Sequence, residues 1–168
     1  MTDDHPGEHR ITDREFPVDR SLVLAFAHAI GEQNPVVLDR EVARAAGLPD
    51  LAAPLTFVQA SAHVDPDYQL RPKADEPWFG SAGGPGTPHP ALANTLHGEQ
   101  HFEYHRPLVV GDVLTWEVVD GEQWTRTGRA GGVLEFTERI TRFRDAAGQP
   151  VVTARAVLVR TEKRQGEA

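Results

Sequence analysis

The feature of this sequence that most constrains its fold is a change in hydrophobic period at about Leu96. Before it, apolar residues recur every three or four positions in short blocks, whereas after it apolar and polar residues alternate at every second position. Alternation with a period of two is typical of half-buried β-strands. Turn residues divide this second half into four such segments, at 96–108, 113–124, 133–145 and 150–160.

The first half of the chain predicts helices. They are expected at 22–30, 40–46 and 54–64, after a short edge strand at 11–18. The third helix is apolar on nearly all sides, so we expect it to be buried. Helices that precede a run of antiparallel strands indicate an α+β fold, with a sheet wrapped on a buried helix.

The length of 168 residues suits a single domain with one substantial core. We expect this domain at 11–161, with a disordered leader at 1–10 and a short tail at 162–168. Within the domain, the segment 65–96 is rich in proline and glycine but also carries three aromatic side chains. Those rings give the segment something to bury, so we interpret it as a packed flap and not as a free linker.

The composition argues against several classes of function. A formal net charge of −8 without a basic cluster disfavours nucleic-acid binding. The absence of cysteine excludes disulfides, thiolate metal sites and a cysteine nucleophile. The longest apolar run, 22–30, is too short to span a bilayer, and residues 1–10 are polar, so we expect no signal peptide. We therefore expect a cytoplasmic protein with no membrane partner.

Four stretches of the chain together resemble the MaoC-like hot-dog proteins. The resemblance is greatest to the N-terminal domains of fatty-acid-synthase-type dehydratases and to accessory subunits of mycobacterial 3-hydroxyacyl-carrier-protein dehydratases. The stretches are AIGEQNPV at 29–36, APLTF at 53–57, LHGEQHFEYHRPLVVGDVL at 96–114 and VVTARAVLVR at 151–160.

This resemblance implies a hot-dog fold, in which an antiparallel sheet wraps a long central helix, here 54–64. It also implies an acyl thioester of coenzyme A or phosphopantetheine as the substrate, with no other cofactor and no metal. Members of the family hydrate trans-2-enoyl thioesters or dehydrate (R)-3-hydroxyacyl thioesters at sites between two hot-dog units. We therefore expect at least a dimer, either with a second copy or with another hot-dog subunit.

Active members of the family carry a motif of the form Gly-Asp-x-Asn-Pro-hydrophobic-His. Gly31, Asn34 and Pro35 match it, but Glu32 stands at the aspartate position and Val37 at the histidine position. An aspartate–histidine pair supplies the base and acid for moving water across the double bond, and positioned proton transfer contributes roughly 10²–10⁴-fold in rate. Valine can neither take nor give a proton, so the resemblance implies a degenerate catalytic motif that retains Glu32 and Asn34.

The resemblance also implies a binding site for the substrate at the central helix. Backbone N–H groups at its start, from Leu55, Thr56 and Phe57, would face the thioester carbonyl. His63, near its end, could approach a substrate, although a satisfied core or helix-end histidine is the alternative interpretation. The buried face of the helix would line an apolar acyl channel.

Three functions are compatible with these residues. In the first, the chain is a catalytically degenerate subunit of an (R)-specific enoyl hydratase or dehydratase and lies beside a hot-dog subunit that has the intact pair. In the second, it is an acyl-CoA thioesterase that uses Glu32 as base or nucleophile. In the third, it is a non-enzymatic acyl-CoA-binding or scaffolding hot dog. Whether the chain is itself an enzyme stays open, because its own motif is incomplete.

Two groups of polar residues on the expected strands have plainer interpretations. His97, His101 and His105 alternate with Glu99 and Glu103. We expect the three histidines on one strand face. Histidines four positions apart on a strand are about 13 Å from each other, a distance that disfavours a metal site. A solvated or subunit-facing surface is the expectation for them. Either a solvated face or contact with coenzyme A phosphates is possible for four arginines, Arg139, Arg142, Arg144 and Arg155.

Overall fold

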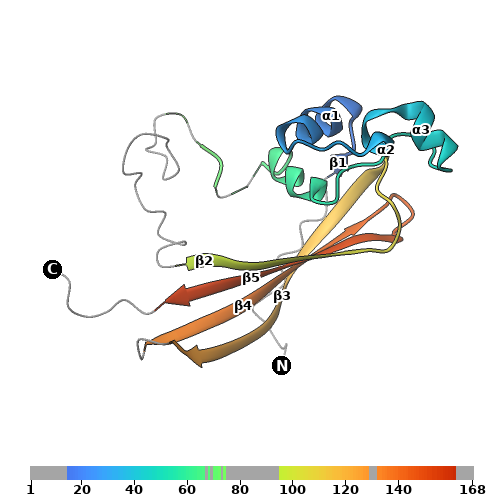
Figure 1. The fold of residues 1–168 in the computed structure, drawn as a ribbon. Helices are drawn as coiled ribbons and strands as arrows, with labels where there is room; N and C mark the ends of the chain where they lie inside the picture. Colours follow the sequence, from blue (N-terminus) through green and yellow to red (C-terminus); the bar gives the residue numbers. More distant parts are fainter. Residues whose placement is uncertain are drawn as a thin grey trace, which may run out of the picture.

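The structure is a computed structural model that describes residues 15–66, 68, 70–72, 74, 95–128 and 132–161. The expected leader, the tail and most of the expected flap lie outside these residues. Helices come first and long strands follow (Figure 1). The elements are β1 (Glu15–Pro17), α1 (Arg20–Ala29), α2 (Pro35–Leu38), α3 (Arg40–Ala45), the 3₁₀ helix η1 (Phe57–His63), β2 (Thr95–Tyr104), β3 (Val113–Thr127), β4 (Val133–Arg144) and β5 (Pro150–Thr161).

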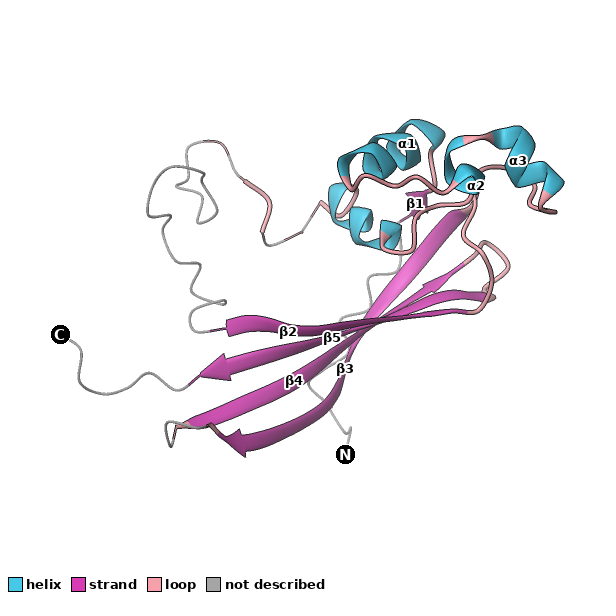
Figure 2. Ribbon diagram, in the orientation of Figure 1, coloured by secondary structure: helices cyan, strands magenta, loops and turns pink. Residues whose placement is uncertain are grey.

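The strands form one sheet in the order β1-β3-β4-β5-β2, and each neighbouring pair is antiparallel. The four segments with a period of two are β2, β3, β4 and β5, so this expectation is confirmed. Figure 2 shows the helices gathered at one end of the sheet, whereas the other ends of these four strands extend away from the helices. The α+β class follows, as the sequence predicts.

The helices differ from expectation in two places. Asp19 caps α1, where its carboxylate accepts from the Ser21 N–H at 2.8 Å. However, the short helix α2 was not expected, and the central helix is shorter than the expected 54–64. It begins at Phe57 and is wound as a 3₁₀ helix of seven residues.

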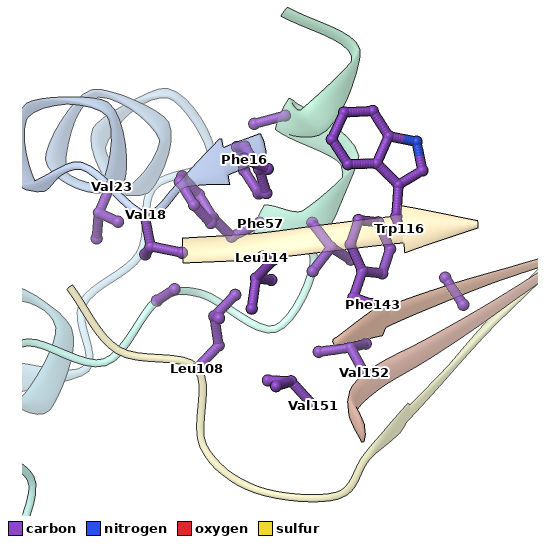
Figure 3. Close-up of a cluster of buried hydrophobic side chains, with 14 of the residues drawn as sticks. Phe16, Val18, Val23, Phe57, Leu108, Leu114, Trp116, Phe143, Val151 and Val152 are labelled. Carbon is purple, nitrogen blue, oxygen red and sulfur yellow. The ribbon is translucent and has the colours of Figure 1, made fainter. Parts of the chain in front are cut away.

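The hydrophobic core lies between η1 and the sheet (Figure 3). Phe57 is fully buried and stacks on Phe16 of β1, with 5.4 Å between the ring centroids. Leu114 and Trp116 of β3 contribute to the same cluster, and the ring centroid of Phe143 of β4 lies 6.4 Å from that of Trp116. Burial of rings and branched side chains of this size is the main force that holds a helix to a sheet.

A β-bulge interrupts β2 close to its beginning. The register of β2 against β5 shifts between His97 and Glu99. Gly98 lies in the bulge, where a Cβ would meet Val159 Cγ2 at 2.7 Å. A larger residue would therefore require Val159 or the strand to shift, which is why glycine suits this position.

The bulge corrects one expectation about the histidines. His97 is opposite Leu158, whereas His101 is opposite Arg155, three residues away on β5. Because side chains alternate between the faces of a strand, His97 and His101 lie on opposite faces. The prediction that all three histidines share a face is wrong for His97, since a bulge cannot be read from a hydrophobic pattern.

The HRPLVVGD stretch is held by an ion-pair network between two turns. Arg106 donates to both oxygens of Asp112, at 2.8 and 2.9 Å, and contacts Asp145 at 3.4 Å. The same Asp112 carboxylate accepts from the N–H of Val109 at 3.0 Å. The hydrogen bond to Asp112 raises the pKa of Arg106, so the guanidinium stays charged. This network joins the β2–β3 loop to the β4–β5 turn and explains why the stretch carries arginine and aspartate.

Candidate active site

The expected catalytic loop, 31–37, begins where α1 ends. Gly31 has a φ of +70°, a left-handed conformation that favours glycine. The N–H groups of Gly31 and Glu32 donate to the carbonyls of His28 and Ala27, at 3.2 and 2.9 Å. These bonds close α1 and set the direction in which the loop leaves it, so the helix expected at 22–30 ends next to this glycine.

The carboxylate of Glu32 turns back onto its own loop. Its Oε1 accepts from the backbone N–H groups of Gln33 and Asn34, each at 2.9 Å. The other oxygen, Oε2, accepts from no residue that the structure describes. Glu32 thus stabilises the loop with one oxygen and retains one oxygen for other contacts.

Asn34 has a similar local role. Its Oδ1 accepts from the N–H of Val36 at 3.2 Å and caps α2, which has Pro35 in its first turn. Proline suits this position because it has no N–H and its φ is already helical. The Asn-Pro pair of the motif therefore starts a short helix, which the helices expected from the sequence did not include.

Val37 is a core residue. Its side chain is 3% exposed and belongs to the hydrophobic cluster between the helices and the sheet. Its N–H donates to the Asn34 carbonyl at 3.0 Å. The position of the missing histidine is thus filled by an apolar side chain that contributes to packing. The loop offers a carboxylate and an amide but no imidazole.

A short extended segment connects this loop to the central helix. The Ala52 N–H donates to the Val36 carbonyl at 3.0 Å. The next residue, Ala53, donates to the Leu108 carbonyl at 2.8 Å, and Ala52 forms a β-bridge with Val109. The loop of the motif and the turn before η1 are therefore held on one backbone frame, as a shared site requires.

The turn before η1 contains the three residues expected to bind substrate. The Phe57 N–H, which we expected to be free, donates to the Pro54 carbonyl at 2.9 Å, and the Phe57 ring is in the core. The N–H groups of Leu55 and Thr56 donate to none of the described residues. The Leu55 side chain is 71% exposed. Two of the three expected donors are thus available on this turn.

Tyr104, which the sequence interpretation did not include, contacts this turn from the sheet. Its hydroxyl donates to the Leu55 carbonyl. Burial raises the pKa of Tyr104 to about 12, so the phenol remains a donor at neutral pH. In a trans peptide the C=O and N–H point in opposite directions, so this bond also orients the Thr56 N–H away from Tyr104.

His63 lies at the far end of η1 and is exposed. Its carbonyl accepts from Arg71 Nη2 at 3.0 Å, and so do the carbonyls of Ala62 and Asp65, at 2.9 and 2.6 Å. Arg71 therefore satisfies carbonyl groups at the end of the helix. The structure places His63 beside this cap and at the opposite end of η1 from Leu55.

Three of the four sheet arginines are in ion pairs. Arg155 and Glu138 are 2.5 Å apart, whereas Arg142 and Arg144 lie 3.6 and 3.9 Å from Glu117. Such pairing favours the sheet-surface interpretation over contact with coenzyme A phosphates.

Two further properties concern the whole described part of the chain. Within it, no group of three or more histidine, aspartate or glutamate side chains is placed to hold a metal ion. None of its helices is both long and apolar enough to cross a membrane.

Comparisons with known proteins agree with this fold. A UPF0336 protein of Clavibacter michiganensis is 35% identical over 144 residues, which cover 86% of this chain and 85% of that protein. A protein of Thermomonospora curvata named "Probable enoyl-CoA hydratase alpha subunit" is 28% identical over 90% of this chain and 47% of its own length.

Among solved structures, the HadBC (3R-hydroxyacyl-ACP dehydratase) complex of Mycobacterium tuberculosis contains a chain with a TM-score of 0.61 and 23% identity. The match covers 95% of this chain and 99% of that one, and shows that the fold is a hot dog. The family model for the FAS1-like dehydratase domain region matches residues 5–154. The chain therefore belongs to the family of FAS1-like dehydratase domain regions.

Proposed function

We propose that this chain is the acyl-binding, catalytically degenerate subunit of an (R)-specific enoyl-thioester hydratase or 3-hydroxyacyl-thioester dehydratase. A second hot-dog subunit would supply the aspartate–histidine pair. The observation that carries this proposal is the burial of Val37 in the core at the histidine position. A chain whose motif loop packs with valine has the scaffold of the site without its proton donor.

The chemistry divides naturally between two subunits. In hydration, the oxygen of water adds to C3 of the enoyl thioester, a base takes a proton from that water, and an acid delivers a proton to C2. Dehydration reverses these steps. The partner would contribute both proton transfers, whereas this chain would bind the acyl thioester, on coenzyme A or phosphopantetheine, with the N–H groups of Leu55 and Thr56 and the apolar surface near η1.

Two relatives support this division. The relative from Thermomonospora is named as a hydratase subunit, and the HadBC structure is a complex of different chains. Glu32 supports it as well, because one of its oxygens accepts hydrogen bonds from the loop backbone. A carboxylate committed in this way has a structural role that does not depend on catalysis.

The test is hydration of crotonyl-CoA by the purified chain, by a hot-dog partner with an intact aspartate–histidine motif, and by the mixture. We expect activity that appears or increases at least tenfold only in the mixture. Efficient hydration by this chain alone would refute the accessory role. No turnover in any combination, together with acyl-CoA binding, would instead indicate a scaffolding protein.

Glu32→Gln provides the matched control. The amide oxygen of glutamine still accepts from Gln33 and Asn34, so the loop keeps its shape while the base is removed. We expect the mixture to retain its kcat with this variant. Release of free thiol from acyl-CoA by the wild-type chain, abolished in Glu32→Gln, would support the thioesterase alternative.

A further inference from the structure

The turn that leads into η1 belongs to a type in which the central peptide has two possible orientations. The Phe57 N–H donates to the Pro54 carbonyl at 2.9 Å, so residues 54–57 form a hydrogen-bonded β-turn. Thr56, the third residue of this turn, has φ −106° and ψ 5°. These angles match a type I turn, in which they are about −90° and 0°, and differ from a type II turn, in which φ is about +80°. The Leu55–Thr56 peptide therefore has the type I orientation.

A rotation of that central peptide would convert one turn type into the other. Types I and II differ by about 150° in ψ of the second residue and by about 170° in φ of the third, whereas the hydrogen bond across the turn is the same. Such a change turns the central peptide over while the ends of the turn stay in place. The Leu55 C=O and the Thr56 N–H would then exchange directions. The direction of the Thr56 N–H thus depends on what prevents this flip.

Tyr104 holds the Leu55 carbonyl from the sheet. Its hydroxyl donates to that carbonyl. On β2, Tyr104 is opposite Val152 of β5, and its half-buried ring packs against the core cluster. This packing fixes the ring and therefore the place of the hydroxyl. A flipped peptide would turn the carbonyl away from this donor and leave the phenol hydroxyl without its partner, which is unfavourable for a partly buried polar group.

The side chain of Thr56 opposes the flip as well. A type II turn requires a positive φ at its third residue, which glycine adopts readily and a β-branched residue does not. Thr56 is exposed, and its side chain makes no capping hydrogen bond to η1. Its contribution to the turn is therefore the backbone preference of a β-branched residue. Two separate restraints, one tertiary and one local, hold the same peptide.

We propose that Tyr104 is a positioning residue for the thioester carbonyl. By holding the Leu55 carbonyl, it directs the Thr56 N–H away from the sheet strand, where a substrate carbonyl can accept from it. This inference rests on the proposed function, in which the N–H groups of Leu55 and Thr56 bind the thioester. Negative charge develops on the carbonyl oxygen in the transition state, and loss of one such donor lowers kcat roughly 10²–10³-fold.

The first test is a double-mutant cycle on the hydration of crotonyl-CoA by this chain mixed with its hot-dog partner. Tyr104→Phe removes only the hydroxyl, and Thr56→Gly removes only the local restraint. Because the other restraint remains in each single variant, we expect kcat to fall about threefold in each. The double variant has neither restraint, so we expect kcat to fall about thirtyfold or more, with a much smaller change in KM.

The size of the double effect distinguishes positioning from a general loss of stability. Independent effects of about threefold would multiply to about ninefold. A double variant that loses only about ninefold or less would overturn the proposal, because the two residues would then not restrain the same peptide. The matched control is Tyr68→Phe, since Tyr68 is the other tyrosine of the chain, is 38% exposed and lies outside the turn. We expect this control to have the kcat of the wild type.

The second test is the crystal structure of each variant without the partner, and it requires no activity. We expect the Leu55 carbonyl to keep its direction in both single variants. In the double variant we expect it to be reversed, with a positive φ at residue 56. A double variant that keeps the type I turn would overturn the proposal.

The two tests together separate this proposal from the proposed function. A reversed peptide in the double variant, with a wild-type mixture that does not hydrate crotonyl-CoA, would refute the proposed function and support the control of the peptide by Tyr104. An active mixture whose kcat is unchanged by a reversed peptide would refute the positioning role of Tyr104 and leave the proposed function intact.

Discussion

Replacement of Val37 by histidine tests whether the missing catalytic residue can be restored. The side chain is 3% exposed and belongs to the core cluster. An imidazole there would bury a polar group without a partner, which costs about 1–3 kcal/mol, and would overpack the site at a cost of about 1–3 kcal/mol. We therefore expect Val37→His to lower the free energy of unfolding by about 3 kcal/mol and to create no hydratase activity.

The assay is thermal unfolding followed by circular dichroism, with crotonyl-CoA hydration measured on the same samples. In a domain of this size, 1 kcal/mol corresponds to about 2–4 °C, so a loss of about 3 kcal/mol lowers Tm by about 6–12 °C. The matched control is Val42→His on α3, because Val42 is 39% exposed. Surface substitutions usually change stability by less than about 0.5 kcal/mol.

The outcome that refutes this reasoning is a Val37→His variant as stable as the wild type. An unchanged stability would mean that the new histidine side chain reaches solvent and that position 37 is not part of the core. A gain of hydration activity in the same variant would further mean that the loop geometry is catalytic, and that one substitution separates this chain from an active one.

Three other substitutions test individual contacts. Tyr104→Phe should lose about 1 kcal/mol of stability in urea unfolding. The variant should also lack the phenol titration near pH 12. In the wild type, the neutral Tyr104 phenol stabilises the folded protein below pH 10, and this stabilisation is lost as the pH rises through about 12. Asp112→Asn should cost about 2 kcal/mol by breaking the bidentate pair with Arg106, and an unchanged urea midpoint would contradict this. The hydrogen bond from Arg155 lowers the pKa of Glu138 below its usual value of 4.5. The pair therefore stabilises the fold above pH 4.5, and this stabilisation is lost as the pH falls through the lowered pKa of Glu138 in the folded state. Glu138→Gln should therefore show a flatter dependence of stability on pH below 4.5, and an unchanged slope would argue against the pair.

The sequence predicts the sheet better than it predicts the helices. Strands β2 to β5 have long alternating patterns, and the alternation of side chains across a sheet makes such patterns unambiguous. The caps of α1 and α3 were also predictable, because Asp19 and Asp39 have short acceptor side chains ahead of helical blocks. The central helix was predicted, but its start at Phe57 and its 3₁₀ winding were not, because helix ends and winding are set by tertiary packing more than by hydrophobic pattern.

At the candidate site, the sequence alone determined which chemical groups are present. Glu32 and Val37 stand where the full motif has aspartate and histidine, and no arrangement of the chain can make valine transfer a proton. The tertiary structure decided where those groups point. It places Val37 in the core, turns Glu32 onto its own loop, brings the Tyr104 hydroxyl to the Leu55 carbonyl and moves His97 off the face of His101. The positions of Val37, Tyr104 and His97 depend on contacts between distant residues or on a single-residue bulge, and neither of these can be read from the hydrophobic pattern of a sequence. The Glu32 contacts are local, but they form only because the backbone of the folded loop brings the N–H groups of Gln33 and Asn34 to the carboxylate.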